Sequence, residues 1–204
     1  MILPNRKSIR LKGYDYSSNG AWFITICTQN RELLFGDIIV GVDPCVDPNP
    51  NSCVDPNPNS CVDPNPYMKL NNVGEMINDW WLKIPNKFTH IELGTFQIMP
   101  NHIHGIIFIN GRTHGHDGRT HGSAPTTVGT IIQWFKTMTT NNYIDNVKNL
   151  NWVPFNQRIW QRNYYEHIIR NNKEMERISQ YITNNPQMWD KDKNNLPESG
   201  RINP

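Results

Sequence analysis

Residues 99 to 109, MPNHIHGIIFI, constrain the fold more than any other stretch of the chain. Their second half is rich in isoleucine and aromatic residues, which favours a buried β-strand. Because successive side chains of a strand point to opposite faces, His102 and His104 should share one face and Ile103 should point into the core. Two imidazoles so placed can hold one divalent cation, although a half-exposed strand edge would carry the same pair without a metal.

A proline-rich repeat interrupts the chain before this strand. The unit CVDPNP begins at Cys45, Cys53 and Cys61. Proline at this density excludes a helix or a central strand, so residues 41–66 are predicted to be an exposed, extended or disordered loop. We interpret it as a tandem duplication in a surface loop, with a proline-rich docking motif as the alternative.

A second repeat, GRTHG, begins at Gly111 and again at Gly118. The stretch 111–124 is rich in glycine, so we interpret it as another expanded loop rather than a metal site. Its histidines are His114, His116 and His121. The chain is therefore predicted to be one domain, residues 1–204, with two low-complexity loop insertions.

The remaining sequence alternates between strand and helix patterns. Strands are predicted over 21–28, 91–99 and 103–109 and within 159–169, and helices over 68–83, 126–143 and 171–184. Asn171 should cap the last helix, with Glu174 as its capping partner. This order predicts an α+β, ferredoxin-like fold, in which an antiparallel four-stranded sheet carries helices on one face and an additional C-terminal helix.

Charge and cysteine content indicate which binding partners and which cellular compartment to expect. The net charge of the 204 residues is only +2, so bulk charge does not demand a nucleic-acid partner. Basic side chains nevertheless cluster in two places, either to contact phosphates or as solvated surface. The clusters are Arg6, Lys7, Arg10 and Lys12, and more loosely Arg158, Arg162 and Arg170. Without a signal peptide, a long apolar run or a zinc-type cysteine spacing, we expect a cytoplasmic protein that makes no membrane contact.

The last predicted helix carries a tyrosine beside its apolar stripe. Tyr181 and Asn185 are four residues apart and so should be neighbours near the helix end. Tyr181 is either an ordinary tyrosine at the edge of the core or a nucleophile. A phenol has a pKa near 10, so a nucleophilic role needs a nearby cation or a group that takes its proton.

Several segments together resemble the single-tyrosine HUH transposases, and within them the REP-associated tyrosine transposases. The stretch MPNHIHGII at 99–107 resembles their HUH motif. Residues 160–171, WQRNYYEHIIRN, look like the segment before their catalytic helix, and 176–186, ERISQYITNNP, look like that helix. The beginning of the chain, RKSIRL and GYDY from Arg6 to Tyr16, is also similar. The likeness extends from Arg6 to Trp189, apart from the two repeats.

The resemblance implies a metal-dependent DNA strand transferase. His102 and His104 would bind Mg²⁺ or Mn²⁺ with Asn185 as third ligand, and Tyr181 would attack a phosphodiester of single-stranded DNA. The product would be a 5′-phosphotyrosine and a free 3′-OH, which can later rejoin DNA at hairpin-forming repeats. The DNA contacts would include Arg162 and Arg170 as well as the basic beginning of the chain. The family includes monomers and homodimers.

Two other functions remain open at the level of sequence. A ferredoxin-like sheet with exposed aromatic residues could bind RNA or single-stranded DNA without catalysis. A metal-dependent phosphodiesterase would use water in place of the tyrosine. Tyr164 and Tyr165 are the rival tyrosines, and His167 is interpreted as a structural or DNA-contacting residue.

Overall fold

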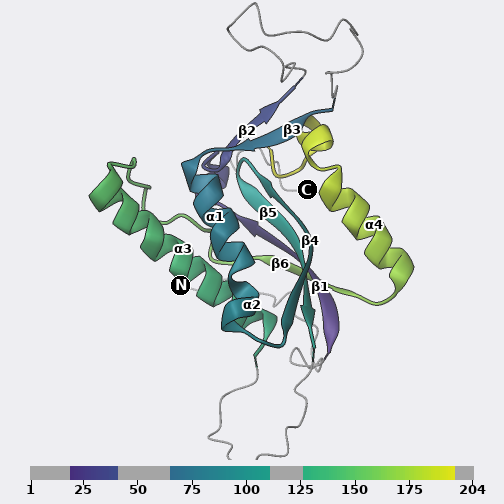
Figure 1. Ribbon diagram of the computed structural model, residues 1–204. Helices are drawn as coiled ribbons and strands as arrows, with labels where there is room; N and C mark the ends of the chain where they lie inside the picture. Colours follow the sequence, from purple (N-terminus) through teal and green to yellow (C-terminus); the bar gives the residue numbers. More distant parts are fainter. Residues whose placement is uncertain (1–18, 41–64, 111–125, 196–204) are drawn as a thin grey trace, which may run out of the picture.

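The computed structural model describes residues 19–40, 65–110 and 126–195, and these form an α+β fold (Figure 1). The main sheet has four antiparallel strands in the order β4-β5-β1-β6. Their bounds are Gly20–Cys27 for β1, Ile91–Met99 for β4, His102–Ile109 for β5 and Tyr165–Ile169 for β6. Strand β4 has a register shift between Leu93 and Phe96, next to Gly94.

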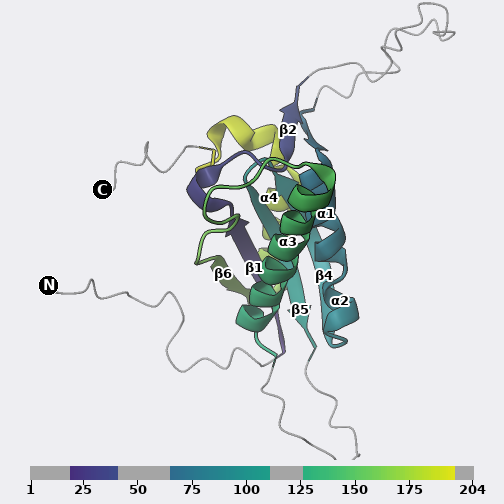
Figure 2. The same ribbon diagram turned by 90° about the vertical axis from the view of Figure 1, so that its left-hand side faces the viewer.

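Helices lie on both faces of this sheet. Helices α1 (Asn72–Leu82) and α3 (Val128–Leu150) pack on one face, and α4 (Asn172–Thr183) lies on the other (Figures 1 and 2). The Asn171 side chain caps α4 by accepting a hydrogen bond from the Glu174 backbone N–H at 2.9 Å. The strand order, the two-helix face and the additional C-terminal helix confirm the predicted ferredoxin-like fold.

The structure corrects the prediction around residue 68. Residues Tyr67–Leu70 form a strand, β3, which pairs with β2 (Gly36–Ile39) in a separate two-stranded sheet. Helix α1 begins only after Asn71, whose side chain accepts from the Gly74 N–H. A short helix, α2 (Ile84–Lys87), follows α1, and α3 continues to Leu150, beyond its predicted end. Two 3-10 helices complete the described chain, η1 (Gln29–Arg31) and η2 (Pro186–Lys191).

Strand alternation separates two apolar layers. Ile103 and Ile107 of β5 face α1 and α3, where they join Trp22, Trp81 and Phe135 in the main core. Gly105 lies on the same face, and a Cβ there would sit 2.4 Å from the Trp81 ring, so only glycine fits. On the opposite face, a smaller cluster packs beneath α4. It consists of Ile106, Ile169, Ile178 and Ile182. His102 and His104 therefore lie on the face that α4 covers.

Several sequence predictions lie outside the described residues. These are the basic cluster of Arg6, Lys7, Arg10 and Lys12, nearly all of the proline-rich repeat and the whole GRTHG repeat. The proline-rich repeat connects β2 to β3, and the GRTHG repeat connects β5 to α3. Among the helices of the described ranges, none combines the length and the apolar character needed to cross a membrane.

Candidate metal and tyrosine site

The two histidines of β5 form a closely spaced buried pair. His102 is 0% exposed and His104 is 1% exposed, and their Nε2 atoms are 3.0 Å apart. Burial lowers the pKa of His102 to about 3 and lowers the pKa of His104 well below 6.5. Both rings are therefore neutral at pH 7, the state in which an imidazole nitrogen binds a metal.

Hydrogen bonds fix which nitrogen of His102 carries the proton. The Asn101 amide nitrogen donates to the carbonyls of Arg31 and Asn194, so its Oδ1 faces His102 as an acceptor. His102 Nδ1 must then donate to Asn101 Oδ1 at 2.8 Å, which leaves the Nε2 lone pair unprotonated. The other ring is held by Thr25 of β1, whose Oγ1 lies 2.8 Å from His104 Nδ1. Both Nε2 atoms thus point into the site, with partners behind them as metal-binding histidines have.

Asp192 and Asn185 line the same cavity as His104, and each has a buried side-chain oxygen without a described partner. Asp192 follows η2, and its Oδ2 lies 3.8 Å from His102 Nε2. Within the part of the chain that the structure describes, neither Asp192 Oδ2 nor the buried Asn185 Oδ1 has a hydrogen-bond partner. Ligand atoms of His102, His104 and Asp192 all lie within 4.8 Å of one another. Two imidazoles, a carboxylate and an amide oxygen are a donor set that fits Mn²⁺ or Mg²⁺, so the residues fit the expected metal.

Tyr181 of α4 is next to the histidine pair. Its hydroxyl lies 3.3 Å from His104 Nε2, and its ring is 5.2 Å from the His104 ring. Burial, and then the charge of Asp192, raise the pKa of Tyr181 above 10, while a hydrogen bond with the Asn185 side chain opposes this. The structure therefore brings together His102, His104, Tyr181 and Asn185, the four residues singled out by the sequence.

The surroundings of the pair differ from the expectation in one respect. The sequence predicts that His102 and His104 lie on an exposed strand face, where alanine would leave the fold intact, but both side chains are buried. The Trp189 ring of η2 stacks on His102, and α4 covers His104. Alanine at either position would leave a buried cavity and an unpaired polar partner, Asn101 or Thr25. Glutamine or asparagine is the better substitution for testing metal binding.

The other candidate residues lie around this site rather than in it. Tyr165 is 46% exposed and edge-on to Phe23, and the Tyr164 hydroxyl donates to Glu166 at 2.8 Å. His167 Nε2 is 2.8 Å from Glu174 Oε1, so it ties β6 to the beginning of α4. Arg162 and Arg170 are exposed, and neither contacts the histidine pair in any described hydrogen bond or ion pair.

Asp192 is the one site residue that sequence reasoning missed. It lies beyond the last residue of the family resemblance, in a polar stretch with no helical or strand periodicity. The only signal in the sequence is that Asp190 and Asp192 are the first acids after the helix that carries Tyr181.

A comparison of sequences identifies one relative. No known family profile matches the chain. An uncharacterized protein of Haemophilus influenzae (strain Rd) is 36% identical over 202 residues, which is 93% of this chain and 93% of that protein. The chain belongs to the family of that protein.

Solved structures show a looser likeness. A REP-associated tyrosine transposase bound to a REP hairpin has a TM-score of 0.46 and 17% identity, covering 88% of this chain and 73% of its own. A Deinococcus radiodurans R1 protein, provisionally assigned as a transposase, has a TM-score of 0.42 and 14% identity, covering 87% of this chain and 97% of its own. A likeness this loose does not carry a function from those proteins to this chain.

Proposed function

We propose that the protein cleaves and rejoins single-stranded DNA at hairpin-forming repeats, with Tyr181 as the nucleophile. One observation carries the proposal: the Tyr181 hydroxyl lies 3.3 Å from His104 Nε2, beside a buried His102–His104–Asp192 group. A tyrosine at the edge of the core needs no such neighbours. A phenol poised beside a set of metal ligands has the arrangement that covalent catalysis on a phosphodiester requires.

His102, His104 and Asp192 would hold a divalent metal, Mg²⁺ or Mn²⁺, with Asn185 as a further ligand. When bound, the metal would neutralise charge on the phosphate and oppose the effect of Asp192 on the phenol. Asp192 improves the fit to these ions, because a carboxylate is a harder ligand than imidazole. The second-layer contacts from Asn101 and Thr25 orient the two rings before any ligand arrives.

The proposed reaction exchanges one phosphodiester for another. The Tyr181 oxygen forms a bond to phosphorus, and the bond from phosphorus to the 3′ oxygen breaks. The phenol releases its proton to water in the cavity, and the leaving oxygen takes up a proton to become a 3′-OH. The 5′ end stays on Tyr181 until a 3′-OH of the same or another strand reverses the step. No ATP is needed, because the phosphoester bond is conserved throughout.

The cavity at Tyr181 suits a DNA strand. Its volume is about 500 Å³, and its walls carry the aromatic rings of Phe23 and Tyr165. Its basic lining residues are Arg177, Lys191 and Lys193. Aromatic faces can stack on unpaired bases while the cations contact phosphates. By contrast, α4 covers much of the sheet face that a simple binding module would present to bases.

Covalent trapping tests the proposal. The protein is incubated with end-labelled hairpin oligonucleotides bearing single-stranded flanks, with and without Mn²⁺, and separated on a denaturing gel. We expect a metal-dependent protein–DNA adduct that Tyr181→Phe abolishes without loss of DNA binding. Cleavage without an adduct would instead indicate a phosphodiesterase that uses water, and binding without cleavage would indicate a non-catalytic module.

A further inference from the structure

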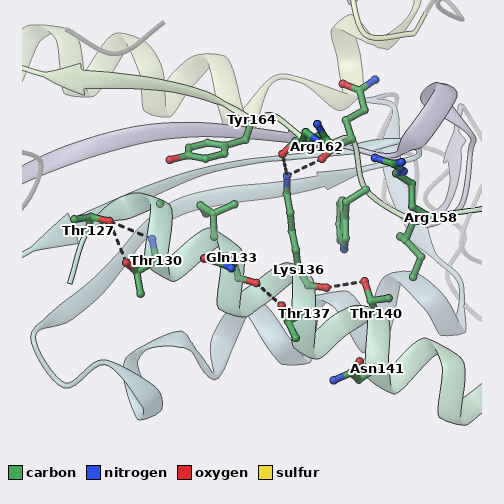
Figure 3. Close-up of a pocket in the computed structure, with 15 residues that line it drawn as sticks. Thr127, Thr130, Gln133, Lys136, Thr137, Thr140, Asn141, Arg158, Arg162 and Tyr164 are labelled. Carbon is green, nitrogen blue, oxygen red and sulfur yellow. Dashed lines mark hydrogen bonds between the residues drawn. The ribbon is translucent and has the colours of Figure 1, made fainter. Parts of the chain in front are cut away.

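A second cavity lies between α3 and the segment that precedes β6. Its volume is about 730 Å³, and polar side chains of α3, including Gln133 and Thr137, form one wall (Figure 3). Arg158 and Arg162 come from the opposite wall. None of the described residues that line this α3 cavity is acidic, and no described carboxylate forms an ion pair with either arginine. The cavity therefore favours an anion.

The wall that carries the two arginines is held in place although it lacks regular structure. The Lys136 ammonium donates to the carbonyls of Gln161 and Arg162 at 2.8 and 3.4 Å (Figure 3). It also donates to the carbonyl of Asn163 at 3.2 Å. The Trp160 indole donates to Thr139 of α3 at 2.9 Å. These contacts fix the backbone that carries Arg162 and the residues next to Arg158, so the cavity is preformed.

The α3 cavity continues towards Tyr181 through a third, smaller one. This middle cavity, of about 310 Å³, shares Gln161 and Tyr164 with the α3 cavity. It shares Tyr165 and Lys193 with the cavity at Tyr181. Because β6 is an edge strand of the sheet, the three cavities form one path around that edge, from the α3 side to the α4 side.

The chemistry along this path is that of a single-strand binding groove. Each cavity has at least one cation, with Arg31 and Lys193 in the middle one. Tyr164 and Tyr165 provide aromatic rings at the two junctions. Among the described residues, Asp192 at the Tyr181 end is the only acid that lines any of the three cavities. Basic side chains interleaved with aromatic faces bind single strands with little dependence on sequence.

We propose that one strand of DNA runs from Tyr181 through the middle cavity into the α3 cavity, where Arg158 and Arg162 contact its phosphates. This inference rests on the proposed function, because that function places DNA at Tyr181. Such a path would keep a flank of the cleaved strand bound by contacts that do not depend on the covalent bond.

The test is equilibrium binding of fluorescent oligo(dT) of 4 to 20 nucleotides to the full chain, in EDTA, across a range of salt concentrations. The double substitution Arg158→Gln/Arg162→Gln should weaken binding of the longest strand on the order of tenfold near 0.1 M salt. It should also reduce the salt slope by roughly 1.4, since each lost phosphate contact on a single strand accounts for about 0.7. The affinity should increase with strand length for both proteins, but it should level off at a shorter strand for the double variant than for the wild type.

The matched control is Lys87→Gln/Lys148→Gln, which removes two exposed charges from α2 and α3 that line none of the three cavities. It should bind like the wild type. An unchanged affinity, salt slope and length dependence in the arginine variant would overturn the path. Because this assay uses neither metal nor Tyr181 chemistry, its failure is distinct from failure to form the covalent adduct.

Discussion

Asp192→Asn should have little effect on stability without metal and a large effect with it. The carboxylate is 2% exposed, and its Oδ2 has no described hydrogen-bond partner. Asparagine keeps the shape, and its uncharged amide would face His102 Nε2, which lies 3.8 Å from Oδ2. Without divalent metal, the free energy of unfolding should stay within about 1 kcal/mol of wild type.

The effect of metal follows from mass action. A ligand at 100 times its Kd stabilises the folded state by about 2.7 kcal/mol. Substitutions of residues that only support metal ligands weaken metal binding by up to roughly 100-fold. Loss of a charged ligand should therefore weaken Mn²⁺ binding by at least that factor. At the same Mn²⁺ concentration, the variant would then gain only about 0.4 kcal/mol. The difference, about 2.3 kcal/mol, corresponds to a loss of roughly 5 to 9 °C in the Mn²⁺-induced shift of Tm.

Thermal unfolding followed by circular dichroism, with Mn²⁺ titrated at constant pH, measures both quantities. Asp190→Asn is the matched control, because Asp190 is exposed two residues away and is outside the cluster. This control variant should retain the full Mn²⁺-induced shift of Tm. The reasoning is refuted if Asp192→Asn shows the wild-type shift, or if the wild-type protein shows no shift at all.

Three further predictions concern the fold. Because the pKa of His102 is lowered to about 3 and that of His104 is also lowered, the unfolded chain binds more protons than the folded one below pH 6.5. In EDTA, stability should therefore fall as the pH falls, by about 2 kcal/mol at pH 5 for His102, with His104 acting in the same direction, and a flat profile in urea denaturation would contradict this. Gly105→Ala should cost about 1 to 3 kcal/mol, because its Cβ would meet Trp81, and a wild-type Tm would show that the ring can move freely. Deleting residues 45–60 should change stability on the order of 1 kcal/mol or less, since Ile39 still pairs with Tyr67, whereas a collapse of Tm would give the repeat a structural role.

Strand and helix periodicity could predict most of this fold because the core elements are long. Strand β5 is rich in isoleucine, helix α4 carries an apolar stripe at helical spacing, and Asn171 marks where α4 begins. The strands β2 and β3 were missed for the opposite reason. Each has four residues, and a low-complexity repeat separates them, so neither has enough length to show a period. The sequence pattern therefore places Leu70 in the helix that follows.

The site could be predicted only as far as local spacing reaches. Alternation places His102 and His104 on one face, and helical spacing places Tyr181 near Asn185. Neither pattern predicts which residues cover the histidines. That depends on how η2 and the turn after it fold back over β5. The same fold-back brings in Asp192, so its role follows from tertiary structure alone.

The most direct test of the central claim is to locate the covalent bond. The trapped protein–DNA adduct is digested with nuclease and protease, and the peptides are analysed by mass spectrometry. We expect a residual nucleotide phosphate on Tyr181, in the peptide that spans α4. A nucleotide on Tyr164 or Tyr165 instead, or cleaved DNA with no modified peptide, would contradict it.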